Sequence, residues 1–458
     1  MRSGGLCASL TADSLDELFS QDILGADYVE VRLDHLKEPQ QAEHARWDRF
    51  PVPVIATCRG VDRGGRFPGS VSEESKILDI AVANGAKFVD IDYQYVRKFG
   101  SAEVIASYHN FDHTPPDLES TIEQACSTSA QIAKVATHVN RWADNRRIFD
   151  ALSRKWDKPV IATGMGDLGQ ITRIAGPSRG SFLSYAFSSS ESAPGQISLK
   201  EMLNVYKFRR VLKSTKLLGV LGMPVGHSKS PVLHNRAFEK SNLDFAYMKF
   251  PANDLDEFFE NAPHCGVEGF SVTIPHKMAI IPFLNRLGPE ASRVGAVNTV
   301  SRASDGWVGD NTDVDGARAA IRSAGFNPPG MRVIILGRGG GARAAEAAVE
   351  GAADVQFLLR NDDLKSNAFD CDLLINATPV GMYPSVEESL AEGTIAASMV
   401  FDMVYNPPIT QLLRNAQSQG KTIIQGGVML AAQAARQFEI WTGKPAPAGV
   451  YVPDWSES

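Results

Sequence analysis

The sequence lacks long apolar runs, a basic N-terminal leader and any excess of positive charge, and each absence narrows the class of protein. No apolar segment is long enough to cross a bilayer as a helix, so we expect no membrane contact. The formal net charge of −7 offers no basic field for nucleic acid. Without a basic segment followed by an apolar one, the N-terminus predicts neither a signal peptide nor a transit peptide.

Paired cysteines and metal-ligand spacings are also missing. The five cysteines are far apart and form no CxxC motif, which predicts reduced thiols and a cytoplasmic protein. The nine histidines show no HxxxH spacing, so no metal site is expected. The composition itself, 43% apolar and 22% charged, is that of a globular protein. At 458 residues, the chain exceeds one hydrophobic core and predicts two or three domains.

Short β-rich segments recur along residues 1–190, separated by segments of mostly helical composition. There are eight of them: Gly5–Thr11, Asp27–Leu33, Val52–Arg59, Phe88–Asp92, Val104–His109, Ile132–Thr137, Val160–Met165 and Ser181–Phe187. Alternating strands and helices favour a parallel sheet, and eight units in roughly 200 residues predict a compact (β/α)8 barrel. An open doubly wound sheet is the alternative. A closing helix is expected after Ser198, which begins a capping box.

Polar residues gather where these strands end, which is where barrel enzymes carry their active sites. Lys134 lies within the sixth strand. Such a lysine commonly snorkels or forms an ion pair, but inside a barrel desolvation favours the neutral amine, a nucleophile towards carbonyls. His109, alone more typical of a structural histidine, could move protons beside it near neutral pH. Arg59 and Arg173 could hold a carboxylate, or form ordinary surface ion pairs.

The second half contains a candidate nucleotide site. Met331–Leu336 is an apolar run that leads directly into GRGGGA (Gly337–Ala342), and Arg343–Glu350 has a helical pattern. Strand, glycine fingerprint and helix in this order predict a dinucleotide site, whereas a glycine cluster alone is usually a turn. Arg360 follows the next strand, Val355–Leu359, at the position where an NAD site has an acidic residue. This position favours an arginine that binds the 2′-phosphate of NADP, and the alternative is an ordinary surface arginine.

Two further motifs suggest acid–base chemistry. Lys277 ends SVTIPHK, and Asp313 ends GDNTD. Together they could protonate a carbonyl oxygen as hydride arrives. Separately, Lys277 would be a surface lysine and the acidic loop a turn or a poor calcium site.

The predicted architecture is α/β: an N-terminal (β/α)8 barrel followed by a two-subdomain α/β dehydrogenase with a Rossmann-type nucleotide domain. The expected boundaries are 1–212 for the barrel, 213–320 for a substrate-binding domain and 321–458 for the nucleotide domain. Leu373–Asn376, Met399–Asp402 and Thr422–Ile424 continue the doubly wound sheet. The C-terminal helix, about residues 426–442, is expected to pack back on the substrate-binding domain.

Over about residues 3–210 the chain resembles the type I 3-dehydroquinate dehydratases. The motifs are EVRLD (Glu30–Asp34), YHNF (Tyr108–Phe111), IAKVA (Ile132–Ala136), ITRIAG (Ile171–Gly176) and SAPGQ (Ser192–Gln196). The resemblance implies that Lys134 forms an imine with the substrate ketone, and that His109 removes the adjacent proton and assists loss of the ring hydroxyl as water. It implies substrate contacts by Glu30, Arg32, Arg59, Arg173, Ser192 and Gln196. One departure is Arg63, which stands where the family has a glutamate; whether Asp62 beside it replaces that glutamate is left open, and if it does not, the positioning of His109 and turnover could suffer.

Residues 217–458 resemble shikimate dehydrogenase through GHSKS (Gly226–Ser230), SVTIPHK, GDNTD, NATPVGM (Asn376–Met382) and GGVMLAAQA (Gly426–Ala434). The resemblance implies that Lys277 and Asp313 are catalytic. It implies substrate contacts by Ser228, Ser230, Thr273, Asn298, Tyr405 and Gln433. For the cofactor it implies Gly337, Gly339, Gly340, Gly341, Ala342, Arg343, Arg360, Thr378 and Gly426. The usual GAGGA reads GRGGG here, and the usual NRT reads Leu-Arg-Asn.

The two resemblances describe consecutive reactions, because 3-dehydroshikimate is the product of the first and the substrate of the second. We therefore expect a bifunctional enzyme that makes shikimate from 3-dehydroquinate with NADP as cofactor. One alternative is a quinate/shikimate dehydrogenase that prefers NAD. The other is a non-catalytic sensor or repressor built from the same folds, against which the presence of both lysines, His109 and Asp313 argues.

Overall fold

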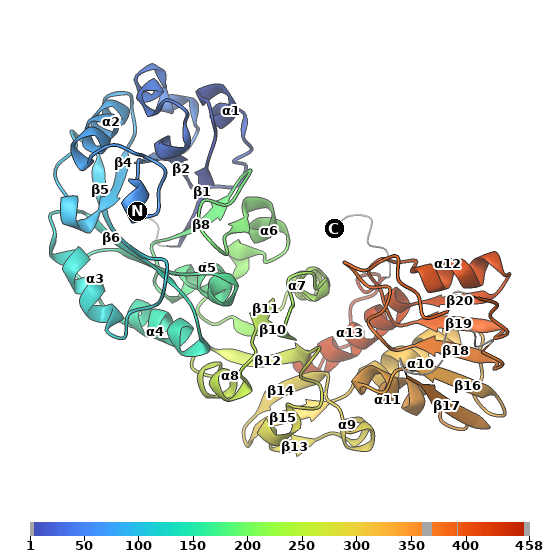
Figure 1. Ribbon diagram of the computed structural model, residues 1–458. Coiled ribbons are helices and arrows are strands. Elements are labelled where there is room, and N and C mark those ends of the chain that lie inside the picture. Colours follow the sequence, from blue (N-terminus) through green and yellow to red (C-terminus); the bar gives the residue numbers. More distant parts are fainter. Residues whose placement is uncertain (1–3, 360–368, 392, 453–458) are drawn as a thin grey trace. The chain divides into compact units, whose positions relative to one another are not determined.

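The computed structural model describes residues 4–359, 369–391 and 393–452 (Figure 1). The chain forms two compact units. The first comprises Met1–Leu217 and Asp244–Val267, and the second comprises Leu218–Leu243 and Glu268–Ser458. Among the helices of the described ranges, none combines the length and apolarity needed to cross a membrane.

A curled sheet of parallel strands forms the centre of the first unit. Its order is β7-β6-β5-β4-β3-β2-β1-β8-β9. The strands are β1 (Gly5–Leu10), β2 (Tyr28–Arg32), β3 (Val54–Thr57), β4 (Phe88–Asp92), β5 (Glu103–Asn110), β6 (Ile132–His138), β7 (Val160–Met165), β8 (Leu183–Phe187) and β9 (Ile197–Ser198). Where β7 and β8 approach, Phe182 N donates a hydrogen bond of 2.8 Å to Val160 O. The eight predicted strands are confirmed in the predicted barrel order, and the two-residue β9 is an addition.

The helices of this unit follow the strands as predicted. They are α1 (Leu15–Ser20), α2 (Val71–Ala83), α3 (Leu118–Ser127), α4 (Trp142–Ser153), α5 (Gln170–Ala175) and α6 (Leu199–Asn204). The predicted cap of the closing helix is present, since Glu201 N donates to Ser198 Oγ at 3.1 Å. β11 (Phe245–Pro251) and α8 (Leu255–Asn261) also belong to this unit.

Strand periodicity builds the interior of the curled sheet in two layers. The lower layer is apolar and contains Cys7, Ile55, Phe88, Ile105, Ile132, Ile161 and Leu183. Two residues further along the same strands lies a buried layer of polar groups: Ser9, Thr57, Asp90, Ser107, Lys134, Thr163 and Tyr185. Because alternate residues of a strand share a face, the apolar layer forms a floor and the polar layer lies on it, towards the carboxyl ends.

The second unit contains two sheets. In one, β12 (Val267–Val272), β14 (Thr299–Ala303) and β15 (Gly306–Asp310) are antiparallel neighbours. β10 (Lys216–Gly222) adjoins β12, and the short β13 (Arg286–Leu287) adjoins β15. The other sheet is parallel, in the order β17-β16-β18-β19-β20. Its strands are β16 (Arg332–Leu336), β17 (Asp354–Leu358), β18 (Leu373–Asn376), β19 (Met399–Asp402) and β20 (Thr422–Gln425). This order confirms the predicted Rossmann-like arrangement.

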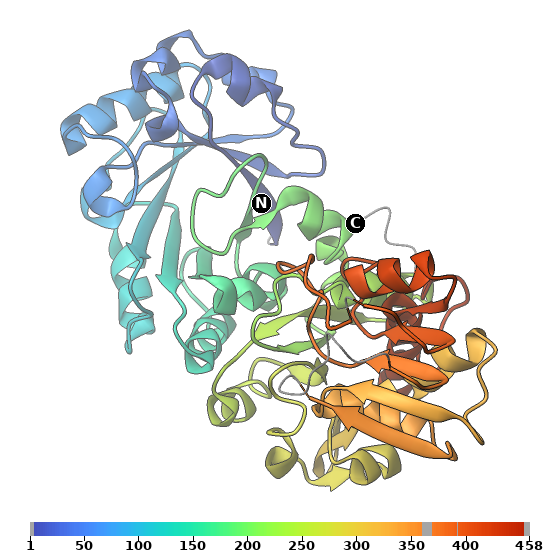
Figure 2. The ribbon, with the colours of Figure 1, turned by 45° about the vertical axis from the view of Figure 1, so that its right-hand side comes forward.

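Helices cover both faces of the parallel sheet (Figure 2). Val333 and Ile335 face a core shared with α10 (Asp313–Ser323), α11 (Gly340–Ala348) and α13 (Gly426–Thr442). The intervening Ile334 and Leu336 face α12 (Gln411–Ser418) on the other side. α7 (Ser230–Lys240) and α9 (Pro289–Val294) complete the unit. α13 also reaches the antiparallel sheet, because Trp441 Nε1 donates to Val300 O at 3.0 Å.

Candidate active sites

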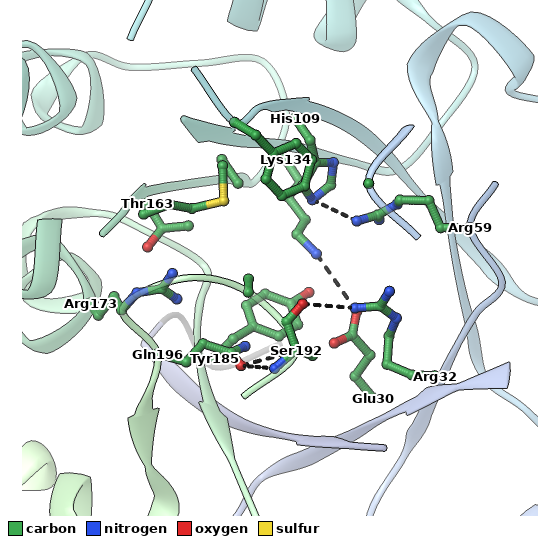
Figure 3. A pocket seen from close by; sticks show the side chains of 15 residues that line it. Glu30, Arg32, Arg59, His109, Lys134, Thr163, Arg173, Tyr185, Ser192 and Gln196 are labelled. Carbon is green, nitrogen blue, oxygen red and sulfur yellow. Dashed lines mark hydrogen bonds and ion pairs between the residues drawn. The ribbon is translucent and has the colours of Figure 1, made fainter. Parts of the chain in front are cut away.

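A hollow of about 440 Å³ lies at the carboxyl ends of the barrel strands. All eight residues expected for the first reaction line it (Figure 3): Lys134, His109, Glu30, Arg32, Arg59, Arg173, Ser192 and Gln196. Further lining residues include Phe111, Thr163, Met165 and Tyr185, none of which the sequence had singled out. The eight come from six different strands, loops and helices, so their convergence follows from the fold and not from local sequence.

Lys134 is buried in this hollow and has carboxylate partners. Its Nζ lies 2.7 Å from Asp90 Oδ2 and 3.8 Å from Glu30 Oε1. The same nitrogen stands 4.1 Å from the centre of the Tyr185 ring. Burial was expected for this nitrogen, and the two carboxylates are ion-pair partners that sequence analysis did not assign to it.

Asp90 is the carboxylate that pairs with both Lys134 and Arg59, although sequence analysis assigned it no role beyond its place at a strand end. Besides Lys134, its carboxylate accepts hydrogen bonds from Arg59 Nη2 at 2.6 Å and Ser107 Oγ at 2.7 Å. Burial alone would raise the pKa of Asp90, but the positive charges of Lys134 and Arg59 lower it below the ordinary value. Asp90 is therefore a fixed negative charge. The alternation of β4, which points it inward with Phe88, was the signal that could have identified it.

His109 is held by an arginine. Its Nε2 lies 2.9 Å from Arg59 Nη1. Because a guanidinium group can only donate, Nε2 must accept, and the ring proton belongs on Nδ1. Burial, together with the positive charges of Arg59 and Lys134, lowers the pKa of His109 well below its ordinary value. The imidazole is consequently neutral, in the form that can accept a proton.

The contacts of Asp62, whose role the sequence left open, are with Arg63. The Asp62 side chain is 72% exposed, and its Oδ1 lies 3.2 Å from Arg63 Nε. Arg63 Nη2 also pairs with the buried Glu74 at 2.8 Å. The physical reason is that Arg63 brings a positive charge that needs carboxylates, so Asp62 is engaged there and not at His109.

The remaining polar groups of the hollow are tied to one another. Glu30 accepts from Ser9 Oγ at 2.6 Å and from Thr57 Oγ1 at 3.0 Å. Arg32 forms a two-pronged pair with Asp34 and also reaches Ser192 O at 3.4 Å. Ser192 N in turn donates to Gln196 Oε1 at 2.8 Å. The loop that carries Ser192 and Gln196 is thus hydrogen-bonded to Arg32 at the end of β2.

Arg173 is the cation with the fewest protein partners in this hollow. Its Nη2 donates to Pro194 O at 3.2 Å, while its buried Nε has no hydrogen-bond partner among the described residues. Burial lowers the pKa of Arg173 to about 10, so the group still carries its charge at neutral pH. A buried guanidinium with an unused donor suits an anionic group such as a carboxylate.

In the second unit the predicted acid–base pair is in contact. Lys277 Nζ donates to Asp313 Oδ2 at 2.5 Å, and Asn298 Nδ2 donates to Asp313 Oδ1 at 2.8 Å. Asn298 Nδ2 also lies 3.4 Å from Gln433 Oε1. Lys277 follows β12, Asn298 precedes β14, Asp313 begins α10 and Gln433 lies on α13. Four elements therefore bring these residues together.

Another residue supports this cluster and was not predicted. Gln437, one turn after Gln433 on α13, is buried and accepts from Ser271 Oγ at 2.8 Å. Its Nε2 donates to Asn298 O at 3.2 Å and to Thr299 Oγ1 at 3.0 Å. Glutamines at spacing i and i+4 share a helix face, which was the available signal.

The glycine fingerprint adjoins the same cluster. Gly337 has φ +102°, a conformation that favours glycine, and an added Cβ would lie 2.9 Å from Thr378 Cγ2. α11 begins at Gly340, where an added Cβ would lie 3.3 Å from Lys277 Cβ. A backbone without side chains therefore passes beside the lysine, as close approach of a dinucleotide requires. α11 starts before the predicted Arg343 because the last glycines form its first turn.

The contacts given for Ser228, Thr273 and Arg343 are with parts of this unit other than the acid–base pair. Ser228 Oγ accepts from Ser230 N at 3.3 Å at the start of α7, and Thr273 N donates to Leu221 O at 2.9 Å. Arg343 Nη1 reaches Val294 O at 3.4 Å, on α9. Burial raises the pKa of Tyr405. Arg360, on which the choice of NADP depended, lies outside the described residues.

A curled barrel with a buried lysine and histidine, joined to a Rossmann-like unit with a lysine–aspartate pair, defines a lyase–dehydrogenase fusion. Comparison with known proteins agrees. The family "Type I 3-dehydroquinase" matches residues 6–213, "Shikimate dehydrogenase substrate binding domain" matches 220–300, and "Shikimate 5'-dehydrogenase C-terminal domain" matches 428–450.

One relative matches both halves. The Arabidopsis thaliana "Bifunctional 3-dehydroquinate dehydratase/shikimate dehydrogenase, chloroplastic" is 35% identical, with 97% of this chain and 83% of that protein covered. The "Shikimate dehydrogenase (NADP(+))" of Microcystis aeruginosa is 38% identical, covering 52% of this chain and 94% of that one. A solved structure, "Dehydroquinate dehydratase and shikimate dehydrogenase from S. pombe AroM", has a TM-score of 0.41 at 25% identity, with 98% of each chain covered. The chain belongs to the family of bifunctional 3-dehydroquinate dehydratase/shikimate dehydrogenases.

Proposed function

We propose that the chain dehydrates 3-dehydroquinate to 3-dehydroshikimate and then reduces this product to shikimate with NADPH, in the synthesis of aromatic amino acid precursors. The observation that carries the proposal is the convergence of all eight expected dehydratase residues on one hollow. The relative that matches 97% of the chain, whose printed name gives both activities, supports the pairing. The names of the NADP-dependent relatives favour this reading over an NAD-dependent quinate enzyme or a non-catalytic regulator.

We assign the dehydratase to residues 1–212 and the substrate-binding domain to 213–320 together with the helix at 426–442. Residues 321–458 form the nucleotide domain in this proposal. The five free thiols, four of them buried, support a reducing compartment, for which we propose the cytoplasm.

The dehydratase step begins with proton transfer away from Lys134, for which neutral His109 is the available base. The amine then adds to the substrate ketone, and the hydroxyl so formed leaves as water with the proton that His109 had received, which leaves a protonated imine and a neutral His109. His109 next removes a proton from the carbon beside the imine, and the electron pair moves towards nitrogen. The ring hydroxyl leaves with a proton returned by His109, so one water is expelled, and hydrolysis of the imine releases the product. Arg173 would hold the substrate carboxylate, while Glu30, Arg32, Arg59, Ser192 and Gln196 would bind its hydroxyls.

In the dehydrogenase step, Lys277 and Asp313 act as a coupled acid–base pair. Lys277 donates a proton to the oxygen of the carbonyl being reduced, and Asp313 holds the ammonium group in place at 2.5 Å. Asn298 and Gln433 fix the pair and offer amide groups to the substrate. We propose that Ser228 and Ser230 bind its carboxylate, with Thr273 and Tyr405 at its hydroxyls.

The nucleotide supplies the hydride. The glycine loop fits such a group, because added side chains would project at Gly340 towards Lys277 and at Gly337 towards Thr378. We propose that Gly337, Gly339, Gly340, Gly341 and Ala342 follow the pyrophosphate at the start of α11. Arg343, Arg360, Thr378 and Gly426 would complete the cofactor site, and Arg360 would select the 2′-phosphate of NADP.

A coupled assay tests the proposal. The purified chain, given 3-dehydroquinate and NADPH with no other enzyme, should consume NADPH. Borohydride added with 3-dehydroquinate should trap a covalent adduct on Lys134. Lys134→Ala should abolish the coupled reaction but keep reduction of 3-dehydroshikimate, whereas Lys277→Met should abolish NADPH consumption with either substrate but keep the formation of 3-dehydroshikimate from 3-dehydroquinate. NADPH consumption only when a separate dehydratase is added would contradict the first activity, and consumption of NADH but not NADPH would contradict the cofactor.

A further inference from the structure

Two hydroxyl groups in the barrel hollow have no role in the scheme above. Tyr185 on β8 and Thr163 on β7 both line the hollow, and their side chains are among the buried groups of the chain, with 4% and 7% exposure. Neither Tyr185 Oη nor Thr163 Oγ1 has a hydrogen-bond partner in the ranges that the structure describes. Other buried hydroxyls of the same layer are satisfied, for example Thr57 by Glu30 and Ser107 by Asp90.

Leaving a buried hydroxyl unpaired destabilises the folded protein, so the two together lower the stability of the free protein. Phenylalanine and valine have nearly the same shapes and would avoid this cost. A hydroxyl that destabilises the free protein is best explained by a partner that arrives later, since activity and stability commonly oppose each other at functional sites.

The position of Tyr185 defines which partner this is. Lys134 Nζ stands 4.1 Å from the centre of the Tyr185 ring, so a molecule bonded to that nitrogen lies against the phenol. Figure 3 shows Thr163 on the same side of the hollow as Arg173, across from Glu30, Arg32 and Arg59. The wall formed by β2 and β3 is already charged and hydrogen-bonded. The wall formed by β7 and β8 presents these two hydroxyls.

We propose that the Tyr185 and Thr163 hydroxyls bind ring oxygens of the dehydratase substrate and so select a ring that carries hydroxyl groups on that side. This inference rests on the proposed dehydratase activity. Burial raises the pKa of Tyr185 well above its ordinary value, so the phenol remains a hydrogen-bond donor throughout the working pH range. Thr163 can donate or accept. Both residues act by binding and take no part in proton transfer.

The test uses Tyr185→Phe and Thr163→Val, which remove each hydroxyl and keep the shape. Each variant should lower the dehydratase kcat/KM for 3-dehydroquinate roughly 10- to 100-fold, mainly through KM, because a hydrogen bond made in both ground and transition states is lost. The borohydride adduct on Lys134 should still form at saturating substrate. Reduction of 3-dehydroshikimate by the other half of the same chain should be unchanged, which controls for folding and concentration.

A matched control and a stability measurement separate binding from structure. Tyr206 is another buried tyrosine of the first unit, but it does not line the hollow, and Tyr206→Phe should leave kcat/KM unchanged. Thermal inactivation of Tyr185→Phe and Thr163→Val should occur at the same or a higher temperature than for the parent chain. A lower temperature would reveal a structural partner and would overturn the proposal.

Substrate analogues that lack one ring hydroxyl assign the contacts. An analogue that lacks the oxygen bound by Tyr185 should bind the parent chain more weakly than the full substrate does. The analogue and the full substrate should bind Tyr185→Phe with similar affinity. If both variants match the parent chain in kcat/KM, the inference fails even though the dehydratase activity stands. If the parent chain has no dehydratase activity, the proposed function itself fails.

Discussion

At the scale of single residues, His109, which we propose as the dehydratase base, is held by a cation and not by a carboxylate. Arg59 donates to His109 Nε2, the very lone pair that would receive a proton, so substrate must displace this bond before the base can act. Arg59 is able to leave because Asp90 also binds it, at 2.6 Å. The guanidinium thus has an anionic partner whether or not it contacts His109. Substrate binding and release of His109 Nε2 from Arg59 would therefore occur together.

The pH dependence of the dehydratase should reveal this arrangement. Burial and the charge of Arg59 are the two largest reasons why the pKa of His109 is lowered. The base is lost where His109 gains a proton, so the acid limb of kcat/KM lies well below the ordinary histidine range. Arg59→Gln removes the charge and keeps a donor, and it should move this limb to higher pH, although KM will rise as well. The measurement is kcat/KM from pH 4 to pH 8.

The dehydrogenase half of the same chain controls this experiment, since its pH profile should not respond to Arg59→Gln. An acid limb that stays in place, or moves to lower pH, would show that Arg59 does not set the protonation of His109.

Sequence could predict which residues enter the hollow but not how they pair there. Lys134 and His109 were identifiable because strand alternation and motif order are local. The choice of Asp90 as the counter-ion of Lys134 depends on side chains from β4 and β6 that meet only after folding. The surroundings of Asp62 and Arg63 stayed open in the sequence for the same reason, since the buried partner of Arg63, Glu74, comes from α2.

At the scale of elements, α13 acts as a brace for the dehydrogenase site. Gln437 forms hydrogen bonds with the backbone oxygen of Asn298 and with the side chains of Ser271 and Thr299. Asn298 is the residue that holds Asp313 in place. The helix therefore acts on the acid–base pair through Asn298 and need not touch the substrate at this point.

Gln437→Met should show this positioning role. Losing the amide leaves buried polar groups unpaired, so the free energy of unfolding should fall by about 1–3 kcal/mol. The dehydrogenase kcat should fall roughly 10-fold, with a smaller change in KM, because the displaced Asp313 weakens proton donation. Arg436→Ala, on the same helix, removes an exposed pair with Glu439 and a positive charge near Asp315, and it should change neither quantity. Reduced stability with unchanged kcat would make Gln437 merely structural.

A second element-scale feature is a buried carboxyl at the end of β19. Asp402 is fully buried and accepts hydrogen bonds from Thr410 Oγ1, Val404 N and Asn376 Nδ2. These bonds connect the loop that carries Tyr405 to the strand end that precedes Thr378. Burial raises the pKa of Asp402 to about 6, although the hydrogen bonds oppose the increase.

Because the folded pKa lies above the unfolded value, the folded form binds the proton more tightly. This contribution to stability is complete below about pH 4 and is lost as pH rises through about 6, amounting to about 3 kcal/mol. Asp402→Asn has no such titration. The difference in unfolding free energy, variant minus parent, should therefore grow by about 3 kcal/mol between about pH 3 and about pH 7 and then stay constant. Unfolding in urea, with the loss of dehydrogenase activity as the signal, measures this difference in free energy. A pH-independent difference would contradict the prediction.

Strands were predictable almost residue by residue in the barrel because each is a short β-rich segment flanked by polar turns; β4 and β7 match the predicted bounds. β13, β14, β15, α9 and α10 were not predicted as separate elements. Their segments contain polar residues such as Asn298 and Asp313 that serve the site, and these interrupt the apolar periodicity on which sequence-based assignment depends.

At the scale of the whole molecule, the predicted domain border near residue 212 differs from the borders of the compact units. Asp244–Val267 belongs with the barrel, although it follows β10 and α7 in sequence. The reason is a cluster of rings: Trp142 on α4 lies 5.5 Å from Phe250 and 4.7 Å from Phe258, both nearly edge-on. Trp142 Nε1 also donates to Pro251 O at 3.1 Å. In sequence, Trp142 was indistinguishable from an ordinary residue on an outer barrel helix.

This cluster predicts that the dehydratase is not independent of residues 244–267. Trp142→Ala in the full chain should cost about 3–5 kcal/mol and lower the temperature of half-inactivation of the dehydratase by about 10 °C. A fragment of residues 1–217 should already be less stable, since its Trp142 lacks both phenylalanines and Pro251. Adding Trp142→Ala to the fragment should then cost much less than in the full chain, because the contacts are gone.

Trp156 provides the matched control for this cycle. It is half-buried, and its Nε1 donates to Ala151 O at 2.9 Å, within the barrel part of the chain. Trp156→Ala should therefore cost the same in the fragment as in the full chain. Equal costs for Trp142→Ala in both backgrounds would mean that the ring cluster contributes nothing to the barrel, and the border near residue 212 would then be the physical one. Unequal costs at Trp142 alone would make residues 244–267 part of the structure that holds the dehydratase together.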